Sequence, residues 1–446
     1  MGCLVNDMRY YLWTIGCQMN FADSRKAAEE LAGLGYQEAS RPQDADLIVL
    51  NTCVVRQSAE DKVVGRLTSL KGLKRRKPGM TLALMGCFVD EIPELQQRYP
   101  WVDAFIRPSD VQSVVELAQG KTVQAPRAGA VTSEGRSPVS VGVPISYGCD
   151  HACTYCIVRL RRGLEISRPV DEIVAEVQDL ARRGVKEITL LGQNVDSYGH
   201  DLADTNRRAG IDRRKLDGGW HPDLADLLEA VHPVEGLARI RFLTSHPSDM
   251  TQRLIETAAK LPKVCEHMEV PVQSGDDTVL RRMGRGYTAA AYRDLVARIR
   301  EAIPGVGLAT DVIVGFPGET ETQYQATYRL LEELRFDMVH VAAYSPRPGT
   351  PAERLADDVP SEEKERRRKE VDLLQGRIVG EINARLLDHS LEVLVEGRHK
   401  GKWRGRTRTN KLVFFDVDGQ DRTGQLVMVR ITRTGPWSMQ GQVQES

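Results

Sequence analysis

The sequence predicts an α/β protein with a parallel N-terminal α/β domain, a central domain of six βα units and a small antiparallel β-barrel at the C-terminus. Three observations lead to this prediction. Apolar runs alternate with helical patterns over residues 9–120, as in a parallel sheet. Six more such alternations follow over residues 141–375. From about Leu391 the pattern changes to short alternating strands with glycine turns, which is typical of a small barrel.

Length and composition bound the class of protein. A chain of 446 residues is long enough for two or three domains with buried cores, and 41% hydrophobic with 28% charged residues is a globular composition. No apolar run reaches the length of a membrane span, and the N-terminus lacks a signal-peptide core, so we expect a cytoplasmic protein with no membrane contact. With a net charge of −1, nucleic acid would have to bind a local patch.

In the N-terminal domain (residues 9–120), each of three predicted strands is followed by a cysteine. The strands are Arg9–Ile15, Leu47–Leu50 and Thr81–Met85, and the cysteines are Cys17, Cys53 and Cys87. We expect Asn20 to cap the first helix, which ends after Leu34. Because parallel strands share one carboxyl edge, the three thiols are predicted to converge and to hold an iron–sulfur cluster with one iron free. The alternative is that each is a small buried residue.

Residues 121–140 are rich in glycine, proline and small polar residues, which indicates a linker. The strands predicted after it are Val141–Ser146, Glu187–Leu191, Arg239–Leu243, His267–Val270, Thr310–Val314 and Met338–Ala343. They form a partial barrel or a doubly wound sheet, and in both folds the ligand lies at the carboxyl ends of the strands. The polar, glycine-containing turns there suit a ligand with an amino acid end and a ribose. The Arg-rich stretch 199–222 is interpreted as a surface insertion, and the alternative is a contact with the substrate.

The strongest motif, directly after the first of these strands, is Tyr147-Gly-Cys149-Asp-His-Ala-Cys153-Thr-Tyr-Cys156. Three thiolates in one short loop hold three corners of a cubic iron–sulfur cluster and leave one iron open for reaction. The alternative is a structural zinc loop, with His151 or a distant cysteine as fourth ligand. Closed zinc sites usually consist of two separated ligand pairs, which favours the iron–sulfur interpretation.

A basic stretch lies in the predicted C-terminal barrel. Residues 398–411 contain seven Lys or Arg and no acid, with Trp403 among them. Basic charge on a small barrel is typical of RNA or single-strand binding, and the residues expected to contact RNA are Lys402, Arg404, Arg406, Arg408 and Lys411. The alternative is an edge strand that its charges protect from aggregation.

The two cysteine triads, together with several shorter motifs, resemble the radical S-adenosylmethionine (SAM) methylthiotransferase family over nearly the whole chain. The shorter motifs are Gly16-Cys-Gln-Met-Asn20, Asn51-Thr-Cys53, Leu191-Gly-Gln-Asn-Val195, Thr244-Ser-His-Pro247 and Arg406-Thr-Arg-Thr-Asn410. Residues 9–120 resemble the family's N-terminal cluster domain, 141–375 its radical SAM domain, a partial (β/α)6 barrel, and 376–446 its RNA-binding TRAM domain. The motifs are most similar to the group that acts on N6-isopentenyladenosine in tRNA.

The resemblance implies a transferase that methylthiolates C2 of N6-isopentenyladenosine at position 37 of tRNA, next to the anticodon, giving 2-methylthio-N6-isopentenyladenosine. It implies two 4Fe–4S clusters as cofactors, one on Cys149, Cys153 and Cys156 that cleaves SAM, and one on Cys17, Cys53 and Cys87 that supplies sulfur. The implied SAM contacts are Tyr155, Gln193, Ser245, Gln273 and Asp311. The implied partners are tRNA and a small electron-transfer protein of the flavodoxin or ferredoxin type, and we expect a monomer.

One departure from the family pattern follows the second triad. Where the family usually has Pro-Tyr after Ile157-Val158, this chain has Arg159–Arg162 with three arginines, which we expect to contact phosphate or to face water. Three alternative functions stay open: methylthiolation of threonylcarbamoyladenosine in tRNA, methylthiolation of an aspartate in a small-subunit ribosomal protein, and RNA binding by an iron–sulfur protein without turnover.

Overall fold

The computed structural model describes residues 8–55, 57–120, 138–202, 222–416 and 419–444. Most of the predicted linker and of the predicted insertion at 199–222 lies outside these residues. The chain divides into two compact units, of which the first comprises residues 1–136, 147–149 and 157–164, and the second residues 137–146, 150–156 and 165–446. None of the described helices is long and apolar enough to cross a membrane.

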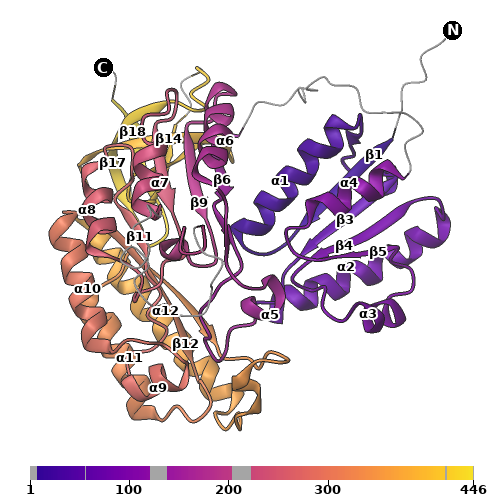
Figure 1. The fold of residues 1–446 in the computed structure, drawn as a ribbon. Coiled ribbons are helices and arrows are strands. Elements are labelled where there is room, and N and C mark those ends of the chain that lie inside the picture. The colour runs from indigo at the N-terminus through magenta and orange to yellow at the C-terminus, as the bar shows by residue number, and fades with distance from the viewer. Residues whose placement is uncertain (1–7, 56, 121–137, 203–221, 417–418, 445–446) are drawn as a thin grey trace. The chain divides into compact units, whose positions relative to one another are not determined.

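The first unit is built on a parallel sheet in the order β2-β1-β3-β4-β5 (Figure 1). Its strands are β1 (Arg9–Thr14), β2 (Gln37–Glu38), β3 (Leu47–Thr52), β4 (Thr81–Gly86) and β5 (Ala104–Ile106). Helices α1 (Gln18–Gly33) and α4 (Val111–Gln119) pack on one face, and α2 (Gln57–Arg76) and α3 (Ile92–Arg98) on the other. Because helices cover both faces, every residue of β3 and β4 is buried, which is why these strands are continuous apolar runs in the sequence.

The start of α1 differs from the prediction. Cys17, not Asn20, is the N-cap residue, and Asn20 lies buried inside the helix. The Asn20 amide donates hydrogen bonds of 2.9 Å to Asn51 Oδ1 and to the Thr52 carbonyl oxygen. Asn51 Nδ2 donates in return to the Asn20 carbonyl oxygen at 2.8 Å. Because the Asn20 side chain forms these buried contacts with the end of β3, it does not cap the helix.

The second unit contains two three-stranded parallel sheets, β10-β9-β6 and β11-β12-β13, which the backbone bridge between Ile240 and Val264 connects. Their strands are β6 (Ser140–Pro144), β9 (Glu187–Leu191), β10 (Arg239–Phe242), β11 (His267–Glu269), β12 (Gly307–Val314) and β13 (Met338–Ala343). The six predicted strands are thus confirmed. In sequence, these strands are separated by the short strands β7 (Ser146–Tyr147) and β8 (Ile166–Ser167) and by the helices α6 (Val170–Arg182), α7 (Leu224–Val231), α8 (Gln252–Lys260), α9 (Asp277–Arg282), α10 (Ala289–Ala302) and α11 (Glu321–Leu334). Helix α5 (Val158–Arg162) belongs to the first unit.

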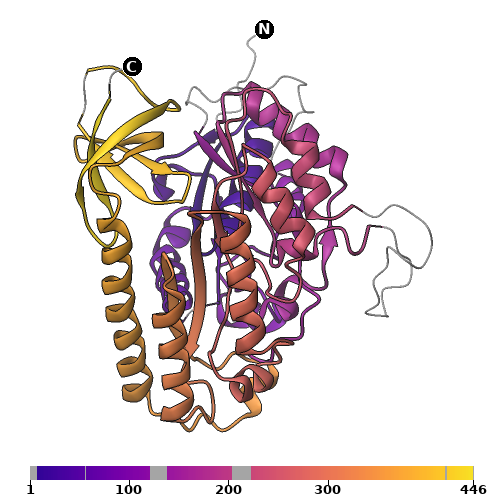
Figure 2. The ribbon, with the colours of Figure 1, turned by 90° about the vertical axis from the view of Figure 1, so that its left-hand side faces the viewer.

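Helix α12 (Ser361–Ala384) leads from β13 into a closed barrel of five strands in the order β14-β15-β16-β18-β17 (Figure 2). The strands are β14 (Ser390–His399), β15 (Lys402–Thr407), β16 (Leu412–Phe415), β17 (Leu426–Thr434) and β18 (Met439–Val443). Trp403 and Phe415 fill the centre of the barrel. The predicted barrel is confirmed, except that β16 and β18 pair in parallel while the other pairs are antiparallel.

Candidate functional site

Three thiols follow three neighbouring strands of the first unit. Residues Thr14 and Asn51, and Thr52 and Gly86, are register partners, so β1, β3 and β4 end at one edge of the sheet. Cys53 and Cys87 follow their strands directly, and Cys17 comes three residues after the last residue of β1. Gly16 allows a close approach there: its φ is +134°, and a Cβ atom on it would lie 2.7 Å from the Cys53 Cβ.

The three thiols differ in exposure and environment. Cys17 is exposed, and its Sγ donates to Asn20 Oδ1 at 3.1 Å. Cys53 and Cys87 are each 5% exposed. Burial raises the pKa of Cys53 to about 11 and also raises that of Cys87, because a thiolate loses its hydration there. These two sulfurs therefore favour the thiolate form only beside positive charge.

The cysteine loop of the second triad is held at its first residue, Cys149, and at Thr154. Cys149, which belongs to the first unit, donates its backbone N–H to the Gly163 carbonyl oxygen at 3.1 Å. In the second unit, Thr154 donates through N to the Met283 oxygen at 2.9 Å and through Oγ1 to the Arg282 oxygen at 2.8 Å. These carbonyls lie at the end of α9, where helix oxygens have no partner within the helix. Thr154 thus fixes the stretch between Cys153 and Cys156.

A buried arginine contacts the same loop. Arg285 Nη1 donates to Cys153 Sγ at 3.4 Å, Nη2 donates to the Pro271 carbonyl oxygen at 3.1 Å, and Nε donates to Tyr287 Oη at 2.8 Å. Although burial opposes it, the contacts with Tyr155, Tyr287 and Cys153 raise the pKa of Arg285. Arg285 is therefore a fixed positive charge beside Cys153.

The predicted SAM contacts lie at or near the carboxyl ends of the strands. Gln193 is half-buried directly after β9. Gln273, after β11, is buried with φ at +68°, and its backbone N–H donates to the Asp311 carbonyl oxygen at 2.8 Å. A non-glycine residue in the left-handed region costs about 1 kcal/mol or more, so the surrounding structure fixes this turn. Burial, and then the charge of the Asp311 carboxylate, raise the pKa of Glu269 to about 7.

The remaining two predicted contacts already have partners in the protein. Ser245 is buried, and its Oγ donates to Asp196 Oδ1 at 2.9 Å. Tyr155 packs against an apolar group that includes Phe316 and Tyr344. Both side chains therefore help to hold the loops around the site in place.

His151, inside the cysteine loop, is part of a hydrogen-bonded cluster. His151 Nε2 lies 2.6 Å from Asp249 Oδ2, which also accepts from Asn194 Nδ2 at 2.6 Å. The His151 and His246 rings stack with centroids 3.7 Å apart and planes 13° apart. Imidazole lone pairs lie in the ring plane, so two nearly parallel rings do not aim at one ion. This geometry favours support of the loop over a metal site made of His151, His246 and Asp249.

Each predicted RNA contact in the barrel lies near an acid. On β15, Lys402 lies 3.3 Å from Asp416, and Glu396 lies 3.2 Å from Arg404 and 3.3 Å from Arg406. These three side chains alternate along one face of the strand and are 39–42% exposed.

The turn after β15 instead contacts the amino ends of the central strands. Arg408 forms a 2.7 Å ion pair with Glu266, before β11, and Lys411 a 2.5 Å ion pair with Asp337, before β13. Arg241 on β10 donates to the Thr407 and Arg408 carbonyl oxygens, each at 2.8 Å. Because Arg408 and Lys411 form ion pairs with the central domain, the side chains of Lys402, Arg404 and Arg406 on β15 are more accessible to a ligand.

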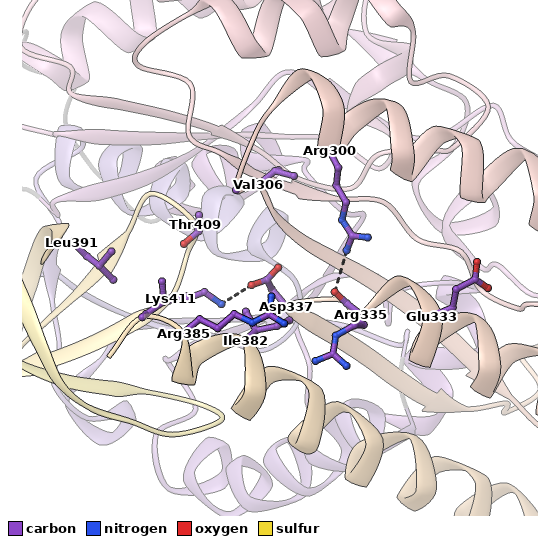
Figure 3. A pocket seen from close by; sticks show the side chains of 12 residues that line it. Arg300, Val306, Glu333, Arg335, Asp337, Ile382, Arg385, Leu391, Thr409 and Lys411 are labelled. Atoms are coloured by element: carbon purple, nitrogen blue, oxygen red, sulfur yellow. Dashed lines mark hydrogen bonds and ion pairs between the residues drawn. The ribbon is translucent and has the colours of Figure 1, made fainter. Parts of the chain in front are cut away.

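A cavity of about 560 Å³ lies beside the same junction, lined among others by Arg300, Arg335, Arg385 and Lys411 (Figure 3). Val306, before β12, and Asp337, before β13, also line it. The cavity is thus at the amino ends of the strands, whereas ligands of α/β sheets bind at the carboxyl ends. We therefore place the reaction at the cysteine loops and not in this cavity.

Comparison with known proteins places these features in a family. Residues 9–107 match the model of the uncharacterized protein family UPF0004, residues 143–331 that of the radical SAM superfamily, and residues 389–444 that of the TRAM domain. The chain is 52% identical over 442 residues, 98% of this chain and 89% of the relative, to the tRNA-2-methylthio-N(6)-dimethylallyladenosine synthase of Roseiflexus sp. (strain RS-1). The chain belongs to this synthase family.

Two other comparisons agree with the assignment to the family. The synthase of the same name from Herpetosiphon aurantiacus is 47% identical over 440 residues, 97% of each chain. Among solved structures, the radical SAM methyltransferase TsrM from Kitasatospora setae, with cobalamin and a 4Fe-4S cluster bound, has a TM-score of 0.54 at 14% identity over 78% of this chain and 77% of that one. That similarity shows a shared fold. The predicted family, fold class and transferase activity are thereby confirmed.

The cofactors of the family are SAM and 4Fe–4S clusters, and the donor sets described above fit them. Each triad offers three sulfur ligands, the usual ligands of such clusters, and leaves the fourth iron without a protein ligand. The raised pKa values of Cys53 and Cys87 mean that a cationic iron core would stabilise thiolates that burial disfavours.

Sequence reasoning missed four polar residues around the second triad: Arg285, Tyr287, His246 and Asp249. They lie in two segments, between β10 and α8 and between α9 and α10, and their contacts with the cysteine loop span about 100 residues or more of sequence. The motif Thr244-Ser-His-Pro247 pointed to the turn that holds His246, but no local pattern marks Arg285 as a partner of Cys153.

Proposed function

We propose that the chain transfers a methylthio group to C2 of N6-dimethylallyladenosine (isopentenyladenosine) at position 37 of tRNA. One observation carries the proposal: Cys17, Cys53 and Cys87 follow three adjacent strand ends, in a chain about half identical over its whole length to synthases named for this nucleoside. A second three-cysteine site, in addition to the cysteine loop that would cleave SAM, is what a sulfur donor requires.

Cys149, Cys153 and Cys156 would hold the cluster that binds SAM, and Cys17, Cys53 and Cys87 the cluster from which sulfur is transferred. When bound, these groups supply one-electron chemistry that replaces an unactivated C–H bond, which no acid–base side chain achieves. The protein's part is to fix the sulfurs. Thr154 holds the second loop on α9, Arg285 keeps a positive charge on Cys153, and the Asn20–Asn51 pair holds the first edge.

SAM would lie at the carboxyl ends of the central strands. Gln193, Gln273 and Asp311 provide polar groups there, and Tyr155 provides an aromatic face for the adenine. Ser245 would act on SAM through Asp196, whose carboxylate accepts its hydroxyl. Burial raises the pKa of Asp196 to about 7, while its two oxygens accept hydrogen bonds from Ser245 Oγ and from the His246 backbone N–H.

The tRNA would be held by phosphate contacts on β15. Lys402, Arg404 and Arg406 share one half-exposed face, and phosphate contacts position an RNA without reading its sequence. Arg408 and Lys411 would contribute mainly by holding the barrel in place. Lys402→Ala should therefore weaken tRNA binding at unchanged thermal stability, whereas Arg408→Ala should lower both. Equal effects of the two variants on filter-binding affinity and unfolding temperature would contradict this division.

The proposed function also requires an electron donor. A flavodoxin- or ferredoxin-type protein would supply electrons to the cysteine-loop cluster, and the enzyme would work as a monomer in the cytoplasm. Reduction by a purified flavodoxin system, followed as 5′-deoxyadenosine formation, tests the first point. Light scattering at micromolar concentration tests the second, and a dimer mass would refute it.

The direct test is an assay of the reconstituted enzyme on two matched tRNA anticodon stem-loops. One carries N6-dimethylallyladenosine and the other N6-threonylcarbamoyladenosine at the same position. We expect methylthiolation of the first only, measured by mass spectrometry of the digested nucleosides. Reaction on the second alone would show that the substrate is N6-threonylcarbamoyladenosine in tRNA instead. If neither reacts while SAM is still cleaved, the ribosomal-protein aspartate becomes the substrate to test.

A further inference from the structure

A buried arginine faces the thiols of the first unit. Arg162, the last residue of α5, has a side chain that is 3% exposed. Its guanidinium donates to Ser109 Oγ at 2.8 Å and to Asn20 Oδ1 at 3.3 Å. The sequence predicted that the arginines after Cys156 contact phosphate or face water, and for Arg162 the second alternative is wrong.

The same guanidinium reaches the predicted ligands. Arg162 is close enough to Cys87 for a side-chain interaction that lowers the pKa of that thiol, and its charge also acts on Cys17 and Cys53. Although burial alone would lower it, the neighbouring sulfurs of Cys87 and Cys17 and the Asp23 carboxyl group raise the pKa of Arg162. The guanidinium keeps its charge at every working pH, so a permanent cation and hydrogen-bond donor faces the sulfurs.

The contacts around Arg162 hold it in one orientation. Asn20 Oδ1 accepts both from Arg162 and from Cys17 Sγ, at 3.3 Å and 3.1 Å. Asp23, 1% exposed on α1, lies 3.7 Å from Arg162 Nη1 and accepts from Ser109 Oγ at 3.0 Å. The guanidinium of Arg162 is therefore held in a buried site. Ser109 and Asp23 orient it, and Asn20 Oδ1 accepts hydrogen bonds both from it and from Cys17 Sγ.

From this geometry we propose that Arg162 is a positioning residue for the cluster held by Cys17, Cys53 and Cys87, donating a hydrogen bond to its sulfur on the Cys87 side. The inference rests on the proposed function. Hydrogen bonds to cluster sulfurs and nearby charge set the reduction potential. A cation stabilises the reduced state, which carries one more electron, so Arg162 raises the potential and strengthens iron retention.

The test uses the full chain with Cys149, Cys153 and Cys156 changed to Ala, so that one cluster site remains. Arg162→Gln removes the charge and the fork, and Arg162→Lys keeps the charge alone. Arg161→Gln is the matched control, because Arg161 lies in the same short helix but pairs with Asp90. After anaerobic reconstitution, iron per chain is measured during exposure to a chelator, and a dithionite titration followed by electron paramagnetic resonance gives the midpoint potential.

We expect Arg162→Gln to lose iron several-fold faster than the parent and to shift the reduced-to-oxidised ratio at fixed potential about tenfold, which is about 59 mV for one electron. Arg162→Lys should fall between the two, and Arg161→Gln should match the parent. If Arg162→Gln does not fold by circular dichroism, the comparison of Arg162→Lys with the parent decides.

Two results would overturn the inference in distinguishable ways. If the parent holds a cluster and both Arg162 variants retain its iron and potential, the role of Arg162 is wrong and the proposed function stands. If the parent with Arg162 intact holds no iron, the cluster assignment to Cys17, Cys53 and Cys87 is itself wrong, and the inference fails with it.

Discussion

The two cysteine triads are built in different ways. In the first unit, residues 34 and more apart in sequence come together because three parallel strands end in register. In the second triad, three cysteines share one loop of eight residues that Thr154 fastens to the end of α9. The first site is therefore a product of the whole sheet, and the second is a product of local sequence held by a few contacts.

The largest effects should come from single ligands. Cys17→Ala is expected to abolish methylthio transfer, by more than 100-fold, while SAM cleavage continues, because the sulfur-donor site alone is lost. Cys153→Ala should abolish both. Chromatography and mass spectrometry of 5′-deoxyadenosine and of the modified nucleoside measure the two activities in one reaction. A Cys17→Ala protein that still transfers the methylthio group would refute the division of labour.

A glycine tests whether the first site depends on sheet geometry. In Gly16→Ala the new methyl group would meet the Cys53 Cβ at 2.7 Å at a φ of +134°, which costs about 1–3 kcal/mol. We expect a lower unfolding temperature and less than half the parent's iron at this site. The control is Gly33→Ala in α1, where nothing lies within 4 Å of the added Cβ, and it should be neutral or stabilising. Unchanged iron in Gly16→Ala would show that the site adapts.

A buried carboxyl group tests the surroundings of the second triad. Burial raises the pKa of Glu165 from 4.5 to about 8, so the folded state binds a proton that the unfolded state releases. Stability should then fall as pH rises from about 4.5 to about 8. Glu165→Gln should remove this fall and unfold at higher temperature than wild type at pH 8.5 but not at pH 5, a gain of about 1–3 kcal/mol.

The matched control for this experiment is Glu301→Gln, since Glu301 is exposed on α10. Glu301→Gln should change the unfolding temperature little at pH 5 and at pH 8.5. A constant difference between wild type and Glu165→Gln across the same range would show that Glu165 is ionised in the folded protein.

The smallest effect should come from the fastening of the loop. Thr154→Val removes the hydrogen bond from Oγ1 to the Arg282 oxygen, worth about 1 kcal/mol. We expect a several-fold decrease in 5′-deoxyadenosine formation with normal iron at the first site. The control is Thr68→Val on α2, where the hydroxyl bonds to the Val64 carbonyl oxygen of its own helix. Loss of iron at both sites would indicate general destabilisation instead.

The same contrast explains what the sequence could predict. Strand ends and cysteine spacing are local patterns, so the sheet, the barrel and both triads followed from them. The orientation of Asn20 did not, because its partner Asn51 is 31 residues away and a capping asparagine and a buried one look alike in sequence. Arg162 was missed for the same reason, since it contacts Asn20 across 142 residues. Charge on a barrel strand likewise did not reveal that Arg408 pairs with Glu266.

The central claim is that this chain thiolates a dimethylallyl-modified adenosine of tRNA. Its most direct test is mass spectrometry of tRNA nucleosides from cells that lack the gene, with and without the gene restored. The account predicts that 2-methylthio-N6-dimethylallyladenosine disappears, that its unthiolated precursor accumulates, and that the restored wild-type gene, but not its Cys17→Ala form, reverses both. An unchanged level of this nucleoside in cells with no second gene of the family would contradict it.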